Sequence, residues 1–233
     1  IFARATQRGG QFYQTQPNIV FIIQNETPAS FKIEATQDLT EMPLANVVGI
    51  IPGKSKANEY VIFSGHYDHL GINTRNIKDN DSIYNGADDN ASGTAVLLEL
   101  ARQASQHPEV QGRNILFIAF SAEEDGLLGS KFFVENSPVP VHDFAYMLNI
   151  DMVGRLNRAD SLMIYATSSA DEWASILRDM PCDQFGIENI PALFPRSDHA
   201  SFVRAGVPAI MLHTGLHEDY HGPTDDLDKI DMD

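Results

Sequence analysis

The chain is poor in features that mark several classes of protein. Cys182 is its only cysteine, so no disulfide can join two of its parts and cysteine usage indicates no redox compartment. Lysine and arginine together number 16 against 32 acidic residues, which gives a formal net charge of −16. So acidic a surface repels nucleic acids and anionic membranes, and we expect neither as a partner.

Long apolar runs are also absent, so we expect no membrane insertion of this chain. The 233 residues, 43% of them hydrophobic, are enough to bury the core of one domain. We therefore predict a single domain over residues 1–233. Residues 1–45 contain strand-like stretches at 18–23 and 31–35 but no recognisable chemistry. Asp231 and Asp233 could form the acidic start of a further helix, so we expect a C-terminal helix beyond them.

Short runs of β-branched and aromatic residues, bounded by turn residues, predict strands at 46–51, 60–64, 115–120, 146–150, 162–166 and 209–213. Helix-like patterns occupy 92–106, 127–136, 170–180 and 199–205, with Ser92 or Asn90 capping the first and Ser197 or Asp198 the last. Several strands are apolar on both faces, which is typical of parallel strands buried inside a sheet. Alternating strands and helices predict an α/β fold of three layers, with a mixed, mostly parallel sheet between helices.

Six side chains that can bind a metal or move a proton each follow an apolar run: His66, Asp88, Glu123, Glu124, Asp151 and His221. An apolar run predicts a buried strand, and the residue that ends it lies at the edge of the sheet. Several strand ends can converge there on one cavity. The sequence therefore predicts a metal site at this edge.

Two of these positions have a local pattern that supports metal binding. His66 offers an imidazole, a common metal ligand, and Asp68 can accept the other ring N–H and fix the tautomer. A polar turn after a strand is the alternative. Asp88 and Asp89 stand among small residues just before a predicted helix and could merely complement its dipole. One carboxylate can also bridge two cations, and the glycines nearby let the backbone approach closely, which favours a site.

Three consecutive acids, 123–125, follow the apolar run at 115–120. Charge runs are usually solvated loops, but carboxylates packed at a strand end need a counter-charge that a divalent metal supplies. One glutamate would bind the metal while its neighbour stays free as a general base. Asp151 ends another apolar strand, and His221 stands in a turn made rigid by Pro223.

Taken together, the order and spacing of these motifs resemble peptidase family M28, the co-catalytic zinc aminopeptidases related to bacterial leucyl aminopeptidase. The segments that carry the resemblance, within roughly residues 46–233, are SGHYDHLG, NGADDNASG, FSAEEDGLLGS, NIDMVGR, SDHASF and YHGPTDDLDKID. The resemblance implies one metal held by His66, Asp88 and Asp151, and a second held by Asp88, Glu124 and His221. It also implies Glu123 as general base, Asp68 as the partner of the histidine ligand, and a cis peptide between Asp88 and Asp89.

The family implies a metal-dependent exopeptidase, an aminopeptidase that hydrolyses N-terminal peptide bonds with a water activated by two metals. Two Zn²⁺ would be the cofactors, although the same ligands accept Co²⁺ or Mn²⁺. Peptides with a free N-terminus would be the substrates. The resemblance also implies a secreted or periplasmic protein, or one anchored to a membrane through a segment outside this chain.

Further residues are expected around the site. Tyr220 is expected to donate a hydrogen bond to the oxyanion, and Arg196 and His199 to contact the substrate at the rim. His69, His213 and His217 are expected either to support the ligands or to line the pocket.

Four other classes of protein are alternatives to an aminopeptidase: glutaminyl cyclases, dipeptidases, carboxypeptidases and non-catalytic binding domains. Glutaminyl cyclases resemble the fold but use a single zinc and lack the first histidine ligand, so His66 argues against them. Dipeptidase and carboxypeptidase activity remain chemically open. A non-catalytic binding domain on this fold would have lost ligands, whereas here each expected ligand is present.

Overall fold

A computed structural model describes residues 30, 32, 34, 42–74, 77–78, 80–107, 112–156, 160–179 and 184–232. The predicted strand at 18–23, most of that at 31–35, and Cys182 lie outside these residues. The chain divides into two units, Ile1–Pro43 and Leu44–Asp233. All the predicted site residues belong to the second unit, which is described below.

A seven-stranded sheet forms the centre of this unit, in the order β1-β5-β2-β6-β9-β7-β8. Its strands are β1 (Val47–Ile51), β2 (Lys56–His66), β5 (Arg113–Phe120), β6 (Phe144–Ile150), β7 (Ser161–Tyr165), β8 (Gly186–Ile190) and β9 (Ala209–His213). The pairs β2/β5, β2/β6, β6/β9 and β7/β8 are parallel, while β1/β5 and β7/β9 are antiparallel. The predicted mixed, mostly parallel sheet is therefore confirmed. Strands β3 (Gly71–Ile72) and β4 (Ile83–Tyr84) pair separately.

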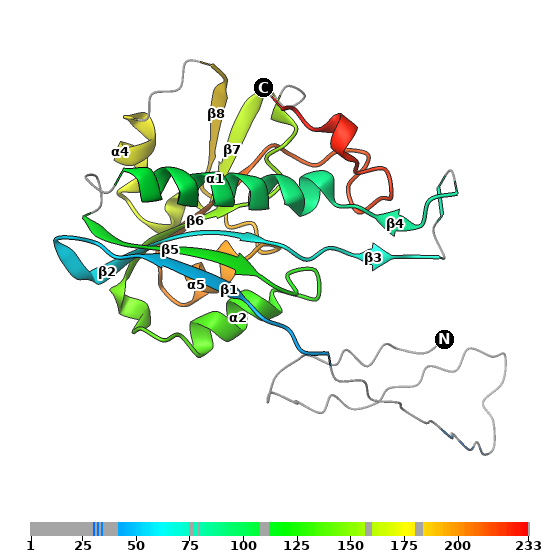
Figure 1. Cartoon of the computed structure of the whole chain (residues 1–233), viewed down its shortest axis with the longest axis horizontal. Helices are drawn as coiled ribbons and strands as arrows, with labels where there is room; N and C mark the ends of the chain where they lie inside the picture. The colour runs from blue at the N-terminus through cyan, green and yellow to red at the C-terminus, as the bar shows by residue number, and fades with distance from the viewer. Residues whose placement is uncertain are drawn as a thin grey trace. The chain divides into compact units, whose positions relative to one another are not determined.

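Helices cover both faces of the sheet. Figure 1 shows α1 (Gly93–Gln106) and α4 (Trp173–Arg178) on one side and α2 (Leu128–Glu135) and α5 (His199–Arg204) on the other. Shorter turns are η1 (Ala87–Ser92), η3 (Val141–Asp143), η4 (Thr167–Ser169) and η5 (Leu227–Lys229). The prediction missed β8, whose sequence GIENI lacks the apolar character of a central strand because it lies at the sheet edge.

One of the predicted side-chain caps is present at α1, whereas neither predicted cap is present at α5. Asn90 caps α1, because its Oδ1 accepts a hydrogen bond from the Gly93 amide at 3.0 Å. At α5 neither proposed cap is used: the Asp198 side chain makes no capping bond, and the Ser197 hydroxyl is directed to Asp151 instead.

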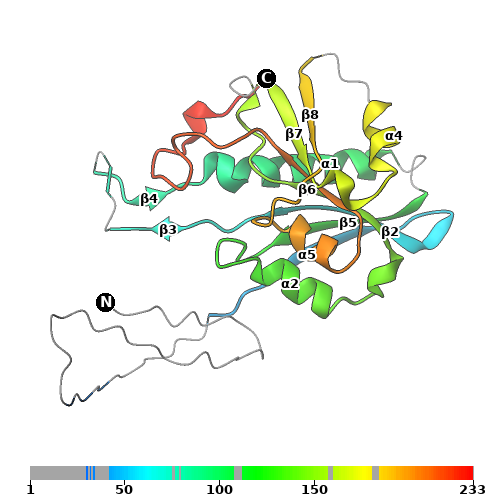
Figure 2. The ribbon, with the colours of Figure 1, turned by 180° about the vertical axis from the view of Figure 1, so that it is seen from behind.

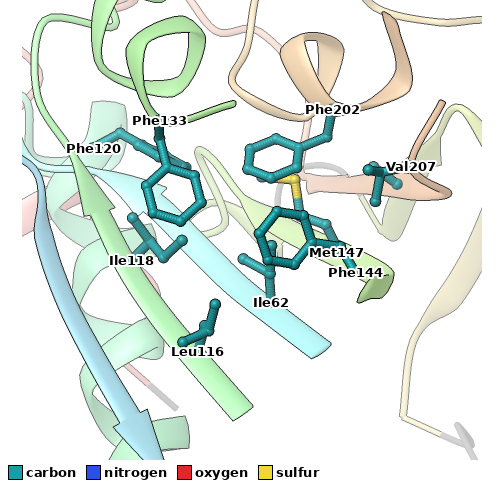
Figure 3. Packing of buried hydrophobic residues seen from close by; sticks show 10 residues of the cluster. Ile62, Leu116, Ile118, Phe120, Phe133, Phe144, Met147, Phe202 and Val207 are labelled. Carbon is teal, nitrogen blue, oxygen red and sulfur yellow. The ribbon is translucent and has the colours of Figure 1, made fainter. Parts of the chain in front are cut away.

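The core fixes where the strands end. Ile62 and Met147, fully buried on adjacent strands, pack against Phe133 of α2 and Phe202 of α5 (Figure 3). A smaller cluster around Trp173 of α4 fills the opposite face. Burying each such side chain contributes about 1.5–3 kcal/mol, so these layers hold the central strands in register.

The chain after β9 returns toward the beginning of α1, as both views of the ribbon show (Figures 1 and 2). The amide of Ala87 donates to the carbonyl oxygen of Asp225 at 3.1 Å, which joins the two segments. Among the residues that the structure describes, no helix has the length and apolar character needed to cross a membrane.

Candidate metal site

The candidate site lies where the carboxyl ends of four neighbouring strands meet. His66 is the last residue of β2, and Asp151 directly follows β6. The glutamates at 123 and 124 follow β5, and His221 belongs to the turn after β9. In open α/β sheets the crevice at the carboxyl ends is where ligands bind.

The carboxylate of Asp89 stands between two histidines. Its Oδ1 lies 3.2 Å from His66 Nε2, and its Oδ2 lies 3.2 Å from His221 Nε2. Asp151 Oδ1 lies 3.5 Å from the same His66 nitrogen, and Glu124 Oε2 lies 3.2 Å from the same His221 nitrogen. Asp89 is thus the side chain shared by two groups of ligand-competent atoms.

The predicted position of the bridging carboxylate was wrong by one residue. Asp88 is fully buried and turned away, since its Oδ1 accepts from the Gly154 amide at 2.7 Å and its Oδ2 lies 3.1 Å from His217 Nε2. The cis peptide joins Asp89 to Asn90, not Asp88 to Asp89. Two adjacent acids before a helix gave no local signal to choose between them, and φ/ψ values outside the helical range at Asp89 turn its side chain toward the histidines.

The pKa values of the neighbouring residues Glu123 and Glu124 are shifted in opposite directions. Burial, opposed by the charge of His66 and aided by that of Asp198, raises the pKa of Glu123 to about 10. Burial also acts on Glu124, but hydrogen bonds from His221 and His69 outweigh it and lower its pKa to about 2. Burial therefore favours the neutral form of Glu123, whereas hydrogen bonds favour the charged form of Glu124.

Asp68 supports the two glutamates more directly than it supports His66. Its Oδ1 accepts from the Glu123 amide at 3.1 Å, and its Oδ2 accepts from the Glu124 amide at 3.3 Å. The ring of His66 donates from Nδ1 to the carbonyl oxygen of Asp68 at 3.1 Å, while the carboxylate is 3.7 Å away. The expected carboxylate partner of the ring is thus replaced by the backbone of the same residue.

Three polar residues hold Asp151 in place, and of these His213 is among the histidines expected from the sequence to support the ligands. The Ser197 hydroxyl donates to Asp151 Oδ2 at 2.6 Å and accepts from Asn149 Nδ2, also at 2.6 Å. His213 Nδ1 donates to the Asp151 carbonyl oxygen at 2.9 Å. The sequence indicates Ser197 only as a helix cap, because a serine before a helix is an ordinary cap signal.

The residues predicted to contact substrate divide into two kinds. Tyr220 and Arg196 line the pocket together with His66, Asp89, Glu123, Asp151 and His221. The Tyr220 ring also stacks on that of His221, with centroids 3.9 Å apart. His199 is fully buried and absent from the pocket lining, so its predicted substrate contact is wrong. Its side chain points into the protein because α5 packs against the sheet, and burial lowers its pKa to about 4.

The donor set fits a metal. His66, Glu123 and Asp151 each offer an atom within 4.8 Å of the others, and so do His69, Asp89 and Glu124. Such closely packed, buried carboxylates repel one another and need a counter-charge, which a divalent cation supplies. Imidazole nitrogens combined with carboxylate oxygens are ligands typical of zinc.

Comparisons with known proteins agree with this geometry. The chain is 29% identical over 212 residues to aminopeptidase YwaD of Bacillus subtilis, covering 87% of this chain and 43% of that protein. It is 30% identical over 197 residues to a probable leucine aminopeptidase of Arthroderma otae, covering 80% of this chain and 52% of that protein. The chain therefore spans about half the length, or less, of these curated relatives.

A solved structure and a family model extend the comparison. The zinc aminopeptidase BSAP of Bacillus subtilis superposes with a TM-score of 0.65 at 28% identity, over 80% of this chain and 45% of that one. The model of peptidase family M28 matches residues 46–233, which include every ligand-competent residue of the site. The chain belongs to peptidase family M28.

Proposed function

We propose that the protein is a metal-dependent aminopeptidase with two zinc ions. The observation that carries the proposal is the position of Asp89 between His66 and His221, with one further carboxylate facing each histidine. His66, Asp89 and Asp151 would hold one cation, and Asp89, Glu124 and His221 the other. When bound, such ions polarise the scissile carbonyl and lower the pKa of a water molecule.

The chain's own residues would carry the proton and the orientation. Glu123 lies with His66 and Asp151 in the pocket, and the positive charge of two bound cations would favour its ionised form, which can accept a proton. It would take the proton of the attacking water and return it to the leaving amine, which leaves poorly unless protonated. Burial and the surrounding carboxylates raise the pKa of Tyr220, so its hydroxyl stays protonated and can donate to the carbonyl oxygen.

The pocket wall favours an apolar N-terminal residue. Met152, Phe194, Met211 and Leu216 line it beside the ligand-competent residues. The negative charge of the site would attract a free α-ammonium, which restricts cleavage to N-terminal bonds. A relative described as a probable leucine aminopeptidase supports the preference for an apolar N-terminal residue.

Arg196 is exposed and also lines the pocket. Its guanidinium would meet the C-terminal carboxylate of a very short peptide, which would add dipeptidase activity to aminopeptidase activity. Amidation of a dipeptide's C-terminus should then raise KM for the wild type but not for Arg196→Gln. Export to the periplasm or the exterior stays a prediction from the family resemblance.

The decisive experiment compares the wild type with Glu123→Gln, using Glu135→Gln on exposed α2 surface as the control. Bound zinc per chain and hydrolysis of Leu-initiated peptides, N-acetylated or free, are measured for all three proteins. We expect two zinc ions in each, cleavage of free peptides only, and a metal-loaded but inactive Glu123→Gln. A single zinc with cyclisation of N-terminal glutamine would instead indicate a glutaminyl cyclase.

A further inference from the structure

Three loops that carry proposed ligands meet a second time behind the site, away from the pocket. They are the loops of Asp89, of Asp151 and of His221. The side chains that join them are Asp88, Arg155, Asp219 and Asp225, all buried and none of them part of the pocket lining. The motifs NIDMVGR and YHGPTDDLDKID contain two of these residues, Arg155 and Asp225, and the proposed catalysis uses neither.

Asp225 contacts the backbone on which Asp89 stands. Its Oδ2 accepts from two successive amides, those of Asp88 at 2.9 Å and Asp89 at 3.0 Å. Its own carbonyl oxygen accepts from the Ala87 amide at 3.1 Å. One fully buried residue thus fixes three successive peptide units directly before the non-helical turn that aims the Asp89 carboxylate.

Arg155 in turn holds Asp225. Its Nη2 donates to Asp225 Oδ1 at 3.0 Å, and its Nη1 donates to Asp219 Oδ2 at 3.3 Å. The other oxygen of Asp219 accepts from Lys229 Nζ and from the Thr224 hydroxyl, both at 2.6 Å. A buried carboxylate is stable only when it is paired and hydrogen-bonded, and here each is.

Asp88 ties the same loops together from a second direction. Its Oδ1 accepts a hydrogen bond from the amide of Gly154, which lies on the Asp151 loop. Its Oδ2 faces His217, which lies on the His221 loop. The cluster therefore links the backbones of three of the ligand-bearing loops. Replacing a residue that fixes the orientation of a metal ligand typically weakens metal binding about 10–100-fold.

We infer that Asp225, held by Arg155, is a positioning residue that sets the Asp89 carboxylate between the two cation positions. The inference rests on the proposed metal site and names the part of the chain that sets its geometry. Neither Asp225 nor Arg155 touches the substrate pocket, so their effect is exerted through Asp89.

The test uses Asp225→Asn, with Asp219→Asn as the matched control. An amide at 225 has one oxygen and cannot accept from both Arg155 and the paired amides. The control makes the same chemical change beside the same arginine, but Asp219 bonds to Lys229 and Thr224 instead of the amides of the Asp89 segment. The readouts are Zn²⁺ affinity by competition with a chelator, the visible spectrum of the Co²⁺ protein, kcat and KM, and urea unfolding without metal.

We expect Asp225→Asn to weaken metal binding about 10–100-fold, to shift the Co²⁺ bands, and to lower kcat more than it changes KM. Asp219→Asn should keep the wild-type cobalt spectrum. Wild-type metal affinity and spectrum in Asp225→Asn, with stability loss equal in both variants, would show a purely structural cluster and overturn the inference.

A second variant covers the case in which Asp225→Asn does not fold. Arg155→Lys keeps the charge but cannot donate to both aspartates in the fork geometry. It should shift the cobalt spectrum in the same direction, and an unchanged spectrum would overturn the inference.

The two proposals fail in different ways. A wild type that binds two metals but cleaves no peptide refutes the aminopeptidase, while the cobalt spectra still judge the role of Asp225. A wild type that cleaves peptides while Asp225→Asn behaves like it refutes only the positioning role. A wild type that binds no metal refutes both.

Discussion

His69 Nδ1 lies 2.8 Å from Glu124 Oε1, the carboxylate oxygen that does not face His221. The ring packs directly on Gly86, where an added Cβ would come within 2.6 Å of His69 Cγ. Glu124 is therefore clamped between two imidazoles, and it presents one defined oxygen to His221. The local motif HYDH thus contributes a residue to each half of the site, His66 to one and His69 to the other.

His69→Ala should weaken metal binding at the position that contains Glu124 by about 10–100-fold, because the carboxylate loses the donor that orients it. The measurement is a two-site Zn²⁺ titration against a chelator. His142→Ala, at a side chain that is 84% exposed, is the control and should bind as the wild type does. Equal affinities in the two variants would mean that Glu124 needs no such support.

Ser197→Ala should both destabilise the protein and loosen the site. The hydroxyl joins Asn149 to Asp151 in a buried chain, so its removal leaves the Asn149 amide without that partner. An unsatisfied buried polar group costs about 1–3 kcal/mol, which urea unfolding would reveal. Ser175→Ala, on an exposed hydroxyl of α4, serves as the reference, and a loss of similar size there would contradict the explanation.

The strand ends were predictable from sequence because apolar runs are local signals. His66, Glu123, Glu124, Asp151 and His221 each follow such a run, and the structure brings all five to one edge of the sheet. The choice between Asp88 and Asp89 was not predictable in this way. It depends on the backbone turn at Asp89 and on the distant amides and histidine that occupy Asp88.

The roles of Ser197, Arg155 and His199 were not predicted from sequence, because they depend on contacts between residues far apart in the chain. Ser197 lies 46 positions from Asp151, and Arg155 lies 70 positions from Asp225. Serine before a helix and aspartate in a turn both have ordinary local explanations, so neither pattern indicates the partner. His199 was misplaced for a related reason, since the side of α5 that faces the sheet is set by packing around Phe202.

Phe133 and its neighbour Phe132 offer a test of the layer that supports the strand ends. Phe133 is 6% exposed and packs in the core, whereas Phe132 is 56% exposed on the same helix. Phe133→Ala should lower the free energy of unfolding by about 3–5 kcal/mol through lost burial and the cavity left behind. Phe132→Ala should change it far less in the same urea titration, and similar losses would place both rings in the core.

Glu99 and Arg102 on α1 should give a pH dependence that is independent of the metal. Hydrogen bonds from Arg102 at 2.7 and 2.6 Å, with help from Gln103, lower the pKa of Glu99 to about 2. The pair therefore stabilises the helix above the ordinary pKa of glutamate, and this contribution is lost as the pH falls toward 2. Carboxyl NMR titration of Arg102→Gln should show the pKa of Glu99 moving back up, while Arg178→Gln on α4 leaves it in place.

Removing metal should lower the melting temperature, since the carboxylates of Asp89, Glu124 and Asp151 would then face one another without the cation that separates their charge. A ligand that binds only the folded protein stabilises it by about 2.7 kcal/mol at a concentration 100 times its Kd. Thermal unfolding in EDTA and after adding back Zn²⁺ should therefore differ clearly for the wild type. Asp89→Asn keeps the size of the side chain but would weaken the binding of both proposed cations, so its two melting curves should nearly coincide. A zinc-dependent shift of wild-type size in Asp89→Asn would place the cations elsewhere in the protein, and Asp88→Asn measured alongside would show whether its neighbour holds them instead.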